Sequence, residues 1–188
     1  MTAGRDTLFF WKPEQEHGFL GQWFPARFVS TKLDGSQITY ESTEQQVPLV
    51  HASCTSSHEY GRYMMHRKGL LFAPDSEITA EILLTSDARE IKALGRAVPN
   101  FDEDIWRDER YDIVVEGNYS KFTQNSELKA QLLGTGDKEL VEASPRDRIW
   151  GVGFGWKRAE EQRARWGLNL LGRALMDVRD RIRRQELD

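Results

Sequence analysis

Hydrophobic residues near the N-terminus fall into short runs, at positions 8–11, 27–29 and 38–40. Turn-forming residues separate these runs: Pro13, Gly18, Pro25 and the pair Asp34-Gly35. Short apolar runs bounded by such residues are typical of β-strands. We therefore expect a small β-sheet near the N-terminus.

From Ser76 onward the spacing of apolar residues becomes that of helices. Two consecutive helices are predicted, the second ending at Gly95. Their apolar faces contain Ile78, Ile82 and Leu83, then Ile91 and Leu94. Further helices are predicted from about 102 to 122, from 125 to 134 and from 169 to 185. The expected fold class is α+β, a helix-dominated single domain with a small N-terminal β-sheet.

The length of 188 residues fits one globular domain. The chain carries 26 Lys and Arg against 30 Asp and Glu, a net charge of -4. This balance lacks the basic footprint of a protein that holds nucleic acid by phosphate contacts alone, but it allows a pocket for one nucleotide. Cys54 is the only cysteine, and no apolar run approaches the roughly 18 residues of a membrane helix. We expect a protein of the reducing cytoplasm with no membrane partner.

The segment 144–155 is the densest group of candidate functional residues. It combines Asp147 with the guanidinium groups of Arg146 and Arg148, an aromatic plane at Trp150 and three glycines, without helical or strand periodicity. Glycines let a backbone approach a ligand closely, and unpaired amides in such loops suit phosphates. The alternative is an ordinary glycine-rich turn with a salt bridge.

Tryptophan is abundant, with six residues at positions 11, 23, 106, 150, 156 and 166. Most tryptophans belong to a core, although an indole face can also stack on a base. A possible metal site at His51, Cys54 and His58 matches no common zinc spacing and lacks a fourth ligand nearby. We expect no metal and no cofactor.

A series of short motifs, each weak alone, is specific in its order and spacing. The motifs are Phe19-Leu20 with Gln22-Trp23-Phe24-Pro25, Tyr40-Glu41-Ser42-Thr43-Glu44-Gln45, Tyr63-Met64-Met65-His66-Arg67-Lys68, Gly95-Arg96, Trp106, Gly117-Asn118 with Lys121-Phe122, Leu140-Val141-Glu142, Asp147 with Trp150-Gly151, and Asn169-Leu170-Leu171-Gly172 with Leu175-Met176. From about Phe9 to Arg179 the chain thus resembles the NADAR family of YbiA-like N-glycosidase domains.

The resemblance implies cleavage of an N-glycosidic bond between ribose and a base or amine. Family substrates include phosphorylated ribosylamine intermediates of the riboflavin pathway and ADP-ribosylated guanine, so the expected partner is a small nucleotide-like substrate or such a guanine in nucleic acid. Carried over residue by residue, the family's catalytic positions fall on Glu44, Lys68 and Asp147. Its substrate-binding positions fall on Trp106, Asn118, Trp150 and Gly151.

These residue types suit the chemistry. Breaking a C1′–N bond builds positive charge on the sugar, which a carboxylate such as Glu44 or Asp147 can stabilise, or the carboxylate can activate water. Lys68 can attack the opened sugar as an amine or bind its phosphate, and both roles stay open. Trp106 offers a flat surface for the departing base. Arg146 or Arg148 can hold a phosphate by paired donors, so both are candidate substrate-binding residues.

The chain departs from the family pattern between Glu44 and Lys68. In the family the lysine follows the glutamate by seven positions, whereas here an extra segment from about Gln46 to Arg62 separates them. This segment contains Pro48 and Gly61, and we expect an exposed loop there, with a helix resuming near Tyr63. It is a natural loop, a splice variant or a gene-model error. If it displaces Glu44, the alternative function is a non-catalytic module that binds ADP-ribose or another nucleotide.

Overall fold

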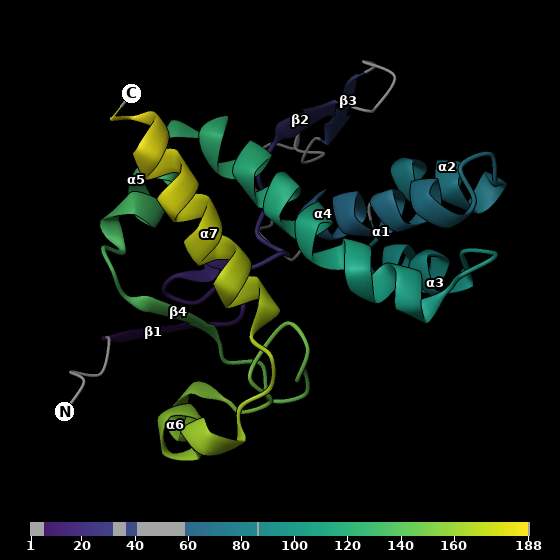
Figure 1. Cartoon of the computed structure of the whole chain (residues 1–188). Helices are drawn as coiled ribbons and strands as arrows, with labels where there is room; N and C mark the ends of the chain where they lie inside the picture. The colour runs from purple at the N-terminus through teal and green to yellow at the C-terminus, as the bar shows by residue number, and fades with distance from the viewer. Residues whose placement is uncertain (1–5, 32–36, 41–58, 86, 188) are drawn as a thin grey trace, which may run out of the picture. The chain divides into compact units, whose positions relative to one another are not determined.

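Helices dominate the fold, and its strands are few and short (Figure 1). The computed structural model describes residues 6–31, 37–40, 59–85 and 87–187. The strands within these ranges are β1 (Thr7–Phe10), β2 (Phe28–Thr31), β3 (Gln37–Tyr40) and β4 (Glu139–Glu142). The α+β class and the three N-terminal strands are therefore confirmed.

The four strands form two separate pairs. Strand β2 pairs with β3 in antiparallel register, as neighbouring strands often do. Strand β1 instead pairs in parallel with β4, so that Thr7 lies opposite Glu139. The sequence pattern missed β4, because its only apolar residues, Leu140 and Val141, lie between two glutamates and do not form a run like those of the N-terminal strands.

Helices α4, α5 and α7 begin and end within about two residues of the predicted boundaries. The helices are α1 (Glu59–Phe72), α2 (Glu77–Leu84), α3 (Ala88–Ala97), α4 (Glu103–Thr123), α5 (Ser126–Gly134), α6 (Trp156–Ala159) and α7 (Leu170–Gln185), with short 3-10 helices η1 (Gly18–Leu20) and η2 (Glu160–Arg165). Side chains cap α2, α3 and α4: Ser76 accepts a hydrogen bond from Ile78 N, Asp87 accepts from Arg89 N and Glu90 N, and Asp102 accepts from Asp104 N and Ile105 N. Within the described ranges, every helix is too short or too polar to cross a membrane.

Gly95 does not end α3, as we had predicted, because the helix continues to Ala97. A Cβ atom at position 95 would lie 2.1 Å from the Sδ atom of Met65 in α1. The glycine is therefore explained by the close packing of α3 against α1. A C-terminal stop needs a left-handed backbone, which Gly95 does not adopt.

Helix α1 begins at Glu59, earlier than the predicted restart near Tyr63. Residues 46–58 of the expected loop lie outside the described part of the chain, but residues 59–62 are helical, so the loop prediction is wrong for them. Gly61 packs so closely that a Cβ atom there would lie 2.2 Å from the Trp23 ring, and Arg62 is buried. This packing offsets the low helix propensity of Gly61.

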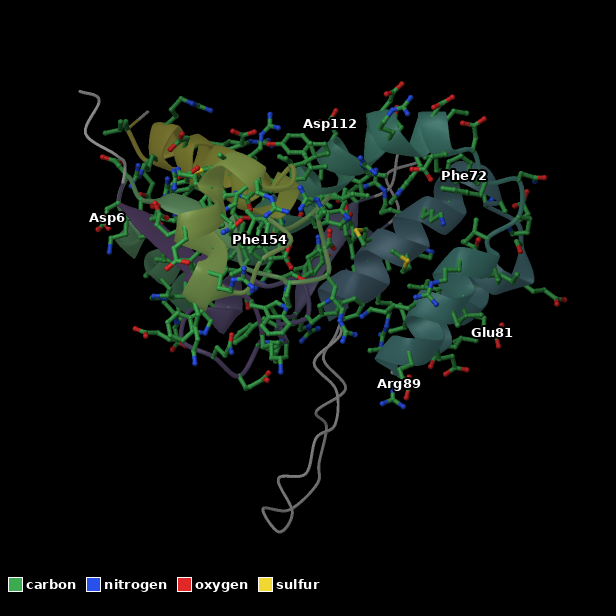
Figure 2. All side chains as sticks on the ribbon, turned by 90° about the horizontal axis from the view of Figure 1, so that it is seen from below. Asp6, Phe72, Glu81, Arg89, Asp112 and Phe154 are labelled. Carbon is green, nitrogen blue, oxygen red and sulfur yellow. The ribbon has the colours of Figure 1, made fainter. Side chains whose placement is uncertain are left out.

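The described residues form two compact units, with a boundary inside α4. In the unit made of 22–113, helices α1, α2 and α3 pack together around Ala73, Ile82 and Val98. Their outer faces carry charged residues such as Glu81 and Arg89 (Figure 2). That the two units together form a single domain stays a prediction.

The second unit combines the first 21 residues with 114–188. In it α7 packs on β4 and also contacts α5 (Figure 1). The predicted apolar stripe of α7 is fully buried and consists of Leu171, Leu175, Val178 and Ile182. A Cβ atom at Gly172 would lie 2.0 Å from the Leu140 carbonyl oxygen, so this glycine allows the helix to approach the strand.

Candidate active site

Lys68 lies in the α1–α3 unit with its amine enclosed by aromatic rings. Its Nζ atom donates a hydrogen bond to the Gly95 carbonyl oxygen over 2.7 Å. The same atom lies 3.8 Å from the Phe101 ring centroid and 5.9 Å from that of Trp106. Burial lowers the pKa of Lys68, and the Glu103 carboxylate opposes that change. The lowered pKa increases the fraction of neutral amine at a given pH.

Trp106 is buried, and it is the second predicted site residue in this group. Helix α4 places its ring beside the Lys68 amine, although the two residues are far apart in sequence. The structure therefore brings together Lys68 and Trp106, as the motif order implied. The aromatic wall formed by Phe101 was not predicted, because Phe101 lies in the short connection before α4 and has no periodic partner.

Asp147 lies in the loop between β4 and α6, in the other unit. Its Oδ1 atom accepts hydrogen bonds from the backbone N–H groups of Ile149 and Trp150, each over 2.8 Å. A carboxylate that accepts from amides two and three positions later forms a local turn. Asp147 thus shapes its own loop and holds Trp150 beside it.

Gly151 brings this loop back onto β4. A Cβ atom there would lie 2.8 Å from the Glu142 carbonyl oxygen, and the next residue, Val152, donates its N–H to that same oxygen over 3.0 Å. A larger residue at position 151 would separate the loop from the strand. Gly151 therefore has a structural role beside Asp147, and its contact with substrate stays a prediction.

Glu142, the last residue of β4, is a candidate that the sequence analysis included in a motif but did not assign to the site. Its Oε2 atom is shielded from solvent and has no hydrogen-bond partner among the described residues. Burial raises the pKa of Glu142 to about 8, with a further contribution from the charge of Asp147. The carboxyl group is therefore mostly protonated at neutral pH. The sequence feature that could have identified Glu142 is an acidic residue directly after two apolar residues and five positions before Asp147.

Asn169 holds the backbone of β4 at Glu142 itself and at Leu140, two residues earlier. Its Oδ1 atom accepts from the Glu142 N–H over 3.0 Å, and its Nδ2 atom donates to the Leu140 carbonyl oxygen over 2.9 Å. Asn169 has a left-handed backbone with φ 49°, a conformation that asparagine tolerates better than most residues. The Asn169 motif thus positions Glu142.

The other predicted binding residues have structural contacts of their own. Arg148 donates to the Arg165 carbonyl oxygen over 2.8 Å and lies 5.8 Å from the Phe154 ring centroid. Asn118 is buried and donates to the Val114 carbonyl oxygen within α4. Arg146 is exposed on the Asp147 loop. Their contacts with substrate stay predictions.

Glu44 lies outside the described residues, as do His51, Cys54 and His58. In the part of the chain that is described, no three His, Cys, Asp or Glu side chains are grouped to hold a metal ion. Lys68 and Trp106 belong to one compact unit, and Asp147 to the other. The family's site positions imply that all three line one pocket, and this stays a prediction.

Comparison with known proteins agrees with the motif order. The sequence model of the NADAR domain matches residues 9–183. The N-glycosidase R617 of Acanthamoeba polyphaga mimivirus is 41% identical over 162 residues, which cover 85% of this chain and 84% of that protein. The riboflavin biosynthesis protein VVA0006 of Vibrio vulnificus is 29% identical over 93% of this chain, but the match covers 38% of its own length.

Among solved structures, the NMR structure of the Escherichia coli protein YbiA is similar with a TM-score of 0.65. The match covers 99% of this chain and 90% of that one, at 21% sequence identity. At this identity the similarity concerns the fold, and it agrees with the α+β class.

Proposed function

The chain belongs to the NADAR domain family, and from that premise we propose that it is an N-glycosidase that hydrolyses the bond between a ribose C1′ atom and the nitrogen of a base or amine. The observation that carries the proposal is the buried, unpartnered carboxyl of Glu142, whose pKa is raised by burial and by the charge of Asp147. Two neighbouring carboxyl groups, of which one holds its proton at neutral pH, are the arrangement that glycoside cleavage uses.

In the proposed reaction Glu142 acts as the general acid. The C1′–N bond breaks, its electron pair goes to the departing nitrogen, and that nitrogen takes the proton from Glu142. Water then adds its oxygen to C1′ and returns a proton to the Glu142 carboxylate. The negative charge of Asp147 stabilises the positive charge that develops on the sugar ring.

We also propose catalytic roles for Lys68 and Glu44, as the family pattern implies. As an alternative to direct addition of water, the neutral Lys68 amine adds to C1′ of the opened sugar and releases the departing amine, and water then hydrolyses the resulting imine to free Lys68. The lowered pKa of Lys68 favours this role over that of a phosphate contact, because only the neutral amine attacks carbon. Glu44 supplies a further carboxylate, as the family pattern implies. Trp106 stacks on the departing base, and Arg146 or Arg148 binds the phosphate.

The proposed substrate is a phosphorylated ribosylamine of riboflavin synthesis or ADP-ribosylated guanine. The first is supported by a relative named as a riboflavin biosynthesis protein, and relatives named N-glycosidases support the bond type. Which of the two substrates the enzyme accepts depends on the shape of its substrate pocket.

Release of base or amine from both substrates tests the proposal. We expect turnover by the full chain and a loss on the order of 100-fold or more in Glu142→Gln, which keeps the size but cannot donate the acidic proton. Arg184→Gln, an exposed change on α7, serves as the control and should leave the rate unchanged. Full turnover in Glu142→Gln removes the acid role, and binding without turnover by the full chain supports the non-catalytic module instead.

A further inference from the structure

An open cleft of about 440 Å³ lies on the unit that contains Asp147. It is lined by Trp11, Pro145 and the run 153–158, on which Figure 2 labels Phe154. The volume falls within the range of small-ligand pockets, about 300–1,000 Å³. The cleft adjoins the loop that carries Asp147. The proposed reaction assigns no role to the residues that line the cleft.

Aromatic rings form the walls of this cleft. Trp156 is 58% exposed, and Trp11 and Phe154 are partly exposed. An indole that is more than half exposed loses most of the burial that normally holds tryptophan in a core. Rings on a cleft wall provide flat faces on which a planar ligand can stack.

Cations stand beside these rings. Lys157 and Arg158 line the cleft and are exposed, and no ion pair among the described residues engages either one. The Nζ atom of Lys157 lies 5.6 Å from the Trp156 ring centroid, and the lining contains no carboxylate. The segment 145–166 has six basic and three acidic residues, although the whole chain has a net charge of -4. The local charge therefore favours an anion.

The floor of the cleft is held in place from beneath. Phe154 packs on a core cluster of Val141, Val152 and Ala159. Gly153 has a φ of 79°, which a residue with a side chain rarely adopts, and a Cβ atom there would lie 2.6 Å from the Arg148 side chain. Supported rings and a constrained backbone give the cleft a fixed shape, which reduces the entropy lost on binding.

We propose that this cleft binds a nucleotide unit other than the one whose base departs, with the base stacked on Trp156 and Trp11 and the phosphate held by Lys157 and Arg158. A planar ring joined to a phosphate through a sugar matches aromatic walls and unpaired cations in one cleft. Such a unit occurs both in a free nucleotide and in a single strand of nucleic acid. The binding claim stands on the cleft alone, and its link to catalysis rests on the proposed N-glycosidase function.

Titration calorimetry of the full chain at low salt, with ligands that divide the nucleotide into parts, tests this binding. We expect AMP to bind at least about tenfold more tightly than adenosine, which lacks the phosphate, or ribose 5-phosphate, which lacks the base. A ten-residue oligothymidylate distinguishes the two sources, because tighter binding of the oligomer per nucleotide indicates a strand and weaker binding indicates a free nucleotide. Equal affinity for AMP and ribose 5-phosphate would overturn base stacking.

Matched variants locate the binding. Lys157→Glu should weaken AMP binding at least about tenfold, whereas Arg184→Glu makes the same charge change on α7 and should not. Trp156→Ala should weaken binding by a similar factor, and Trp156→Phe should retain most of it. Equal effects of the two charge variants would overturn the proposal.

The turnover assay separates this inference from the proposed function. If the chain binds AMP at this cleft but cleaves no N-glycoside, the proposed function fails and the cleft stands. If turnover proceeds with an unchanged KM in both Lys157→Glu and Trp156→Ala, and neither variant weakens AMP binding, the cleft proposal fails and the N-glycosidase stands.

Discussion

At the scale of single residues, the carboxyl of Glu142 links stability to pH. Its pKa is about 8 in the folded protein, against an ordinary value of 4.5. Between these values the folded state holds a proton that the unfolded state has lost. The free energy of unfolding should therefore fall as pH rises through this window, by up to about 1.4 kcal/mol per pH unit.

Urea denaturation at pH 5, 6, 7 and 8 measures this dependence. Glu142→Gln cannot lose a proton, so we expect its unfolding free energy to fall less steeply over the same range. Buried Lys121 acts in the opposite direction at higher pH, because burial lowers its pKa to about 7. Parallel curves for the parent and Glu142→Gln would contradict the assignment.

The Lys68 amine is the second residue whose chemistry can be measured directly. If it attacks the sugar, ring opening gives an imine, which borohydride reduces to a stable amine. We expect mass spectrometry to find the trapped sugar on Lys68 after borohydride is added during turnover, and no adduct in Lys68→Met. An adduct in Lys68→Met, or none in an active parent, favours a phosphate contact.

The sequence predicts some of these residues better than others. Lys68, Trp106 and Asp147 stand in motifs whose order is informative by itself. Glu142 differs, because what distinguishes it is that its carboxyl group is buried and that its pKa is raised. That property arises when Gly151 brings the loop onto β4 and Asn169 fixes the strand. No spacing of residues along the chain encodes such an environment.

At the scale of elements, the contact between α7 and β4 depends on one glycine. Gly172→Ala places a Cβ atom 2.0 Å from the Leu140 carbonyl oxygen, a backbone atom that cannot rotate away. We expect a loss of about 1–3 kcal/mol in the free energy of unfolding, the range of overpacked cores. Nothing lies within 4 Å of a Cβ atom at Gly134, so Gly134→Ala is the matched control. Equal unfolding midpoints for the two variants in urea would show that the contact is loose.

In helix α1, the position seven residues before Lys68 differs from the family pattern. Gly61 stands seven positions before Lys68, the spacing at which the family pattern has its glutamate. The Trp23 ring fills the space that a side chain at Gly61 would need. In the full chain this position of the helix therefore lacks a carboxylate.

Deletion of residues 46–62 joins Gln45 to Tyr63 and places Glu44 seven positions before Lys68. Glu44 then takes the helical position of Gly61, so the Trp23 ring must move aside to admit its side chain. With that shift made, we expect the deleted protein to turn over faster, because a displacement of about 1 Å in a catalytic group can cost on the order of 100-fold in rate. The same deletion with Glu44→Gln is the control and should lose the gain. If the deleted protein is both less stable and less active, the segment belongs to the working fold.

At the scale of the whole molecule, elements with a repeated apolar stripe or a distinct apolar run were predictable, and elements with neither were not. Helices α4 and α7 repeat their apolar stripe over several turns, so their ends were predicted within about two residues. Strand β4 and helix α6 have four residues each and show no period. The Trp156 cleft depends on both, because β4 supports the loop from which α6 begins.

The pairing of β1 with β4 has a consequence for how the protein is made. The unit 22–113 is contiguous in sequence, whereas β1 must wait until β4, whose first residue Glu139 pairs with Thr7, has been made. At about 5–20 residues per second, that wait lasts on the order of ten seconds. During it the edge of β1 is open to other strands. Glu142 and Asp147 emerge after the wait, so a nascent chain acquires both acids only once β4 and the loop after it have been made.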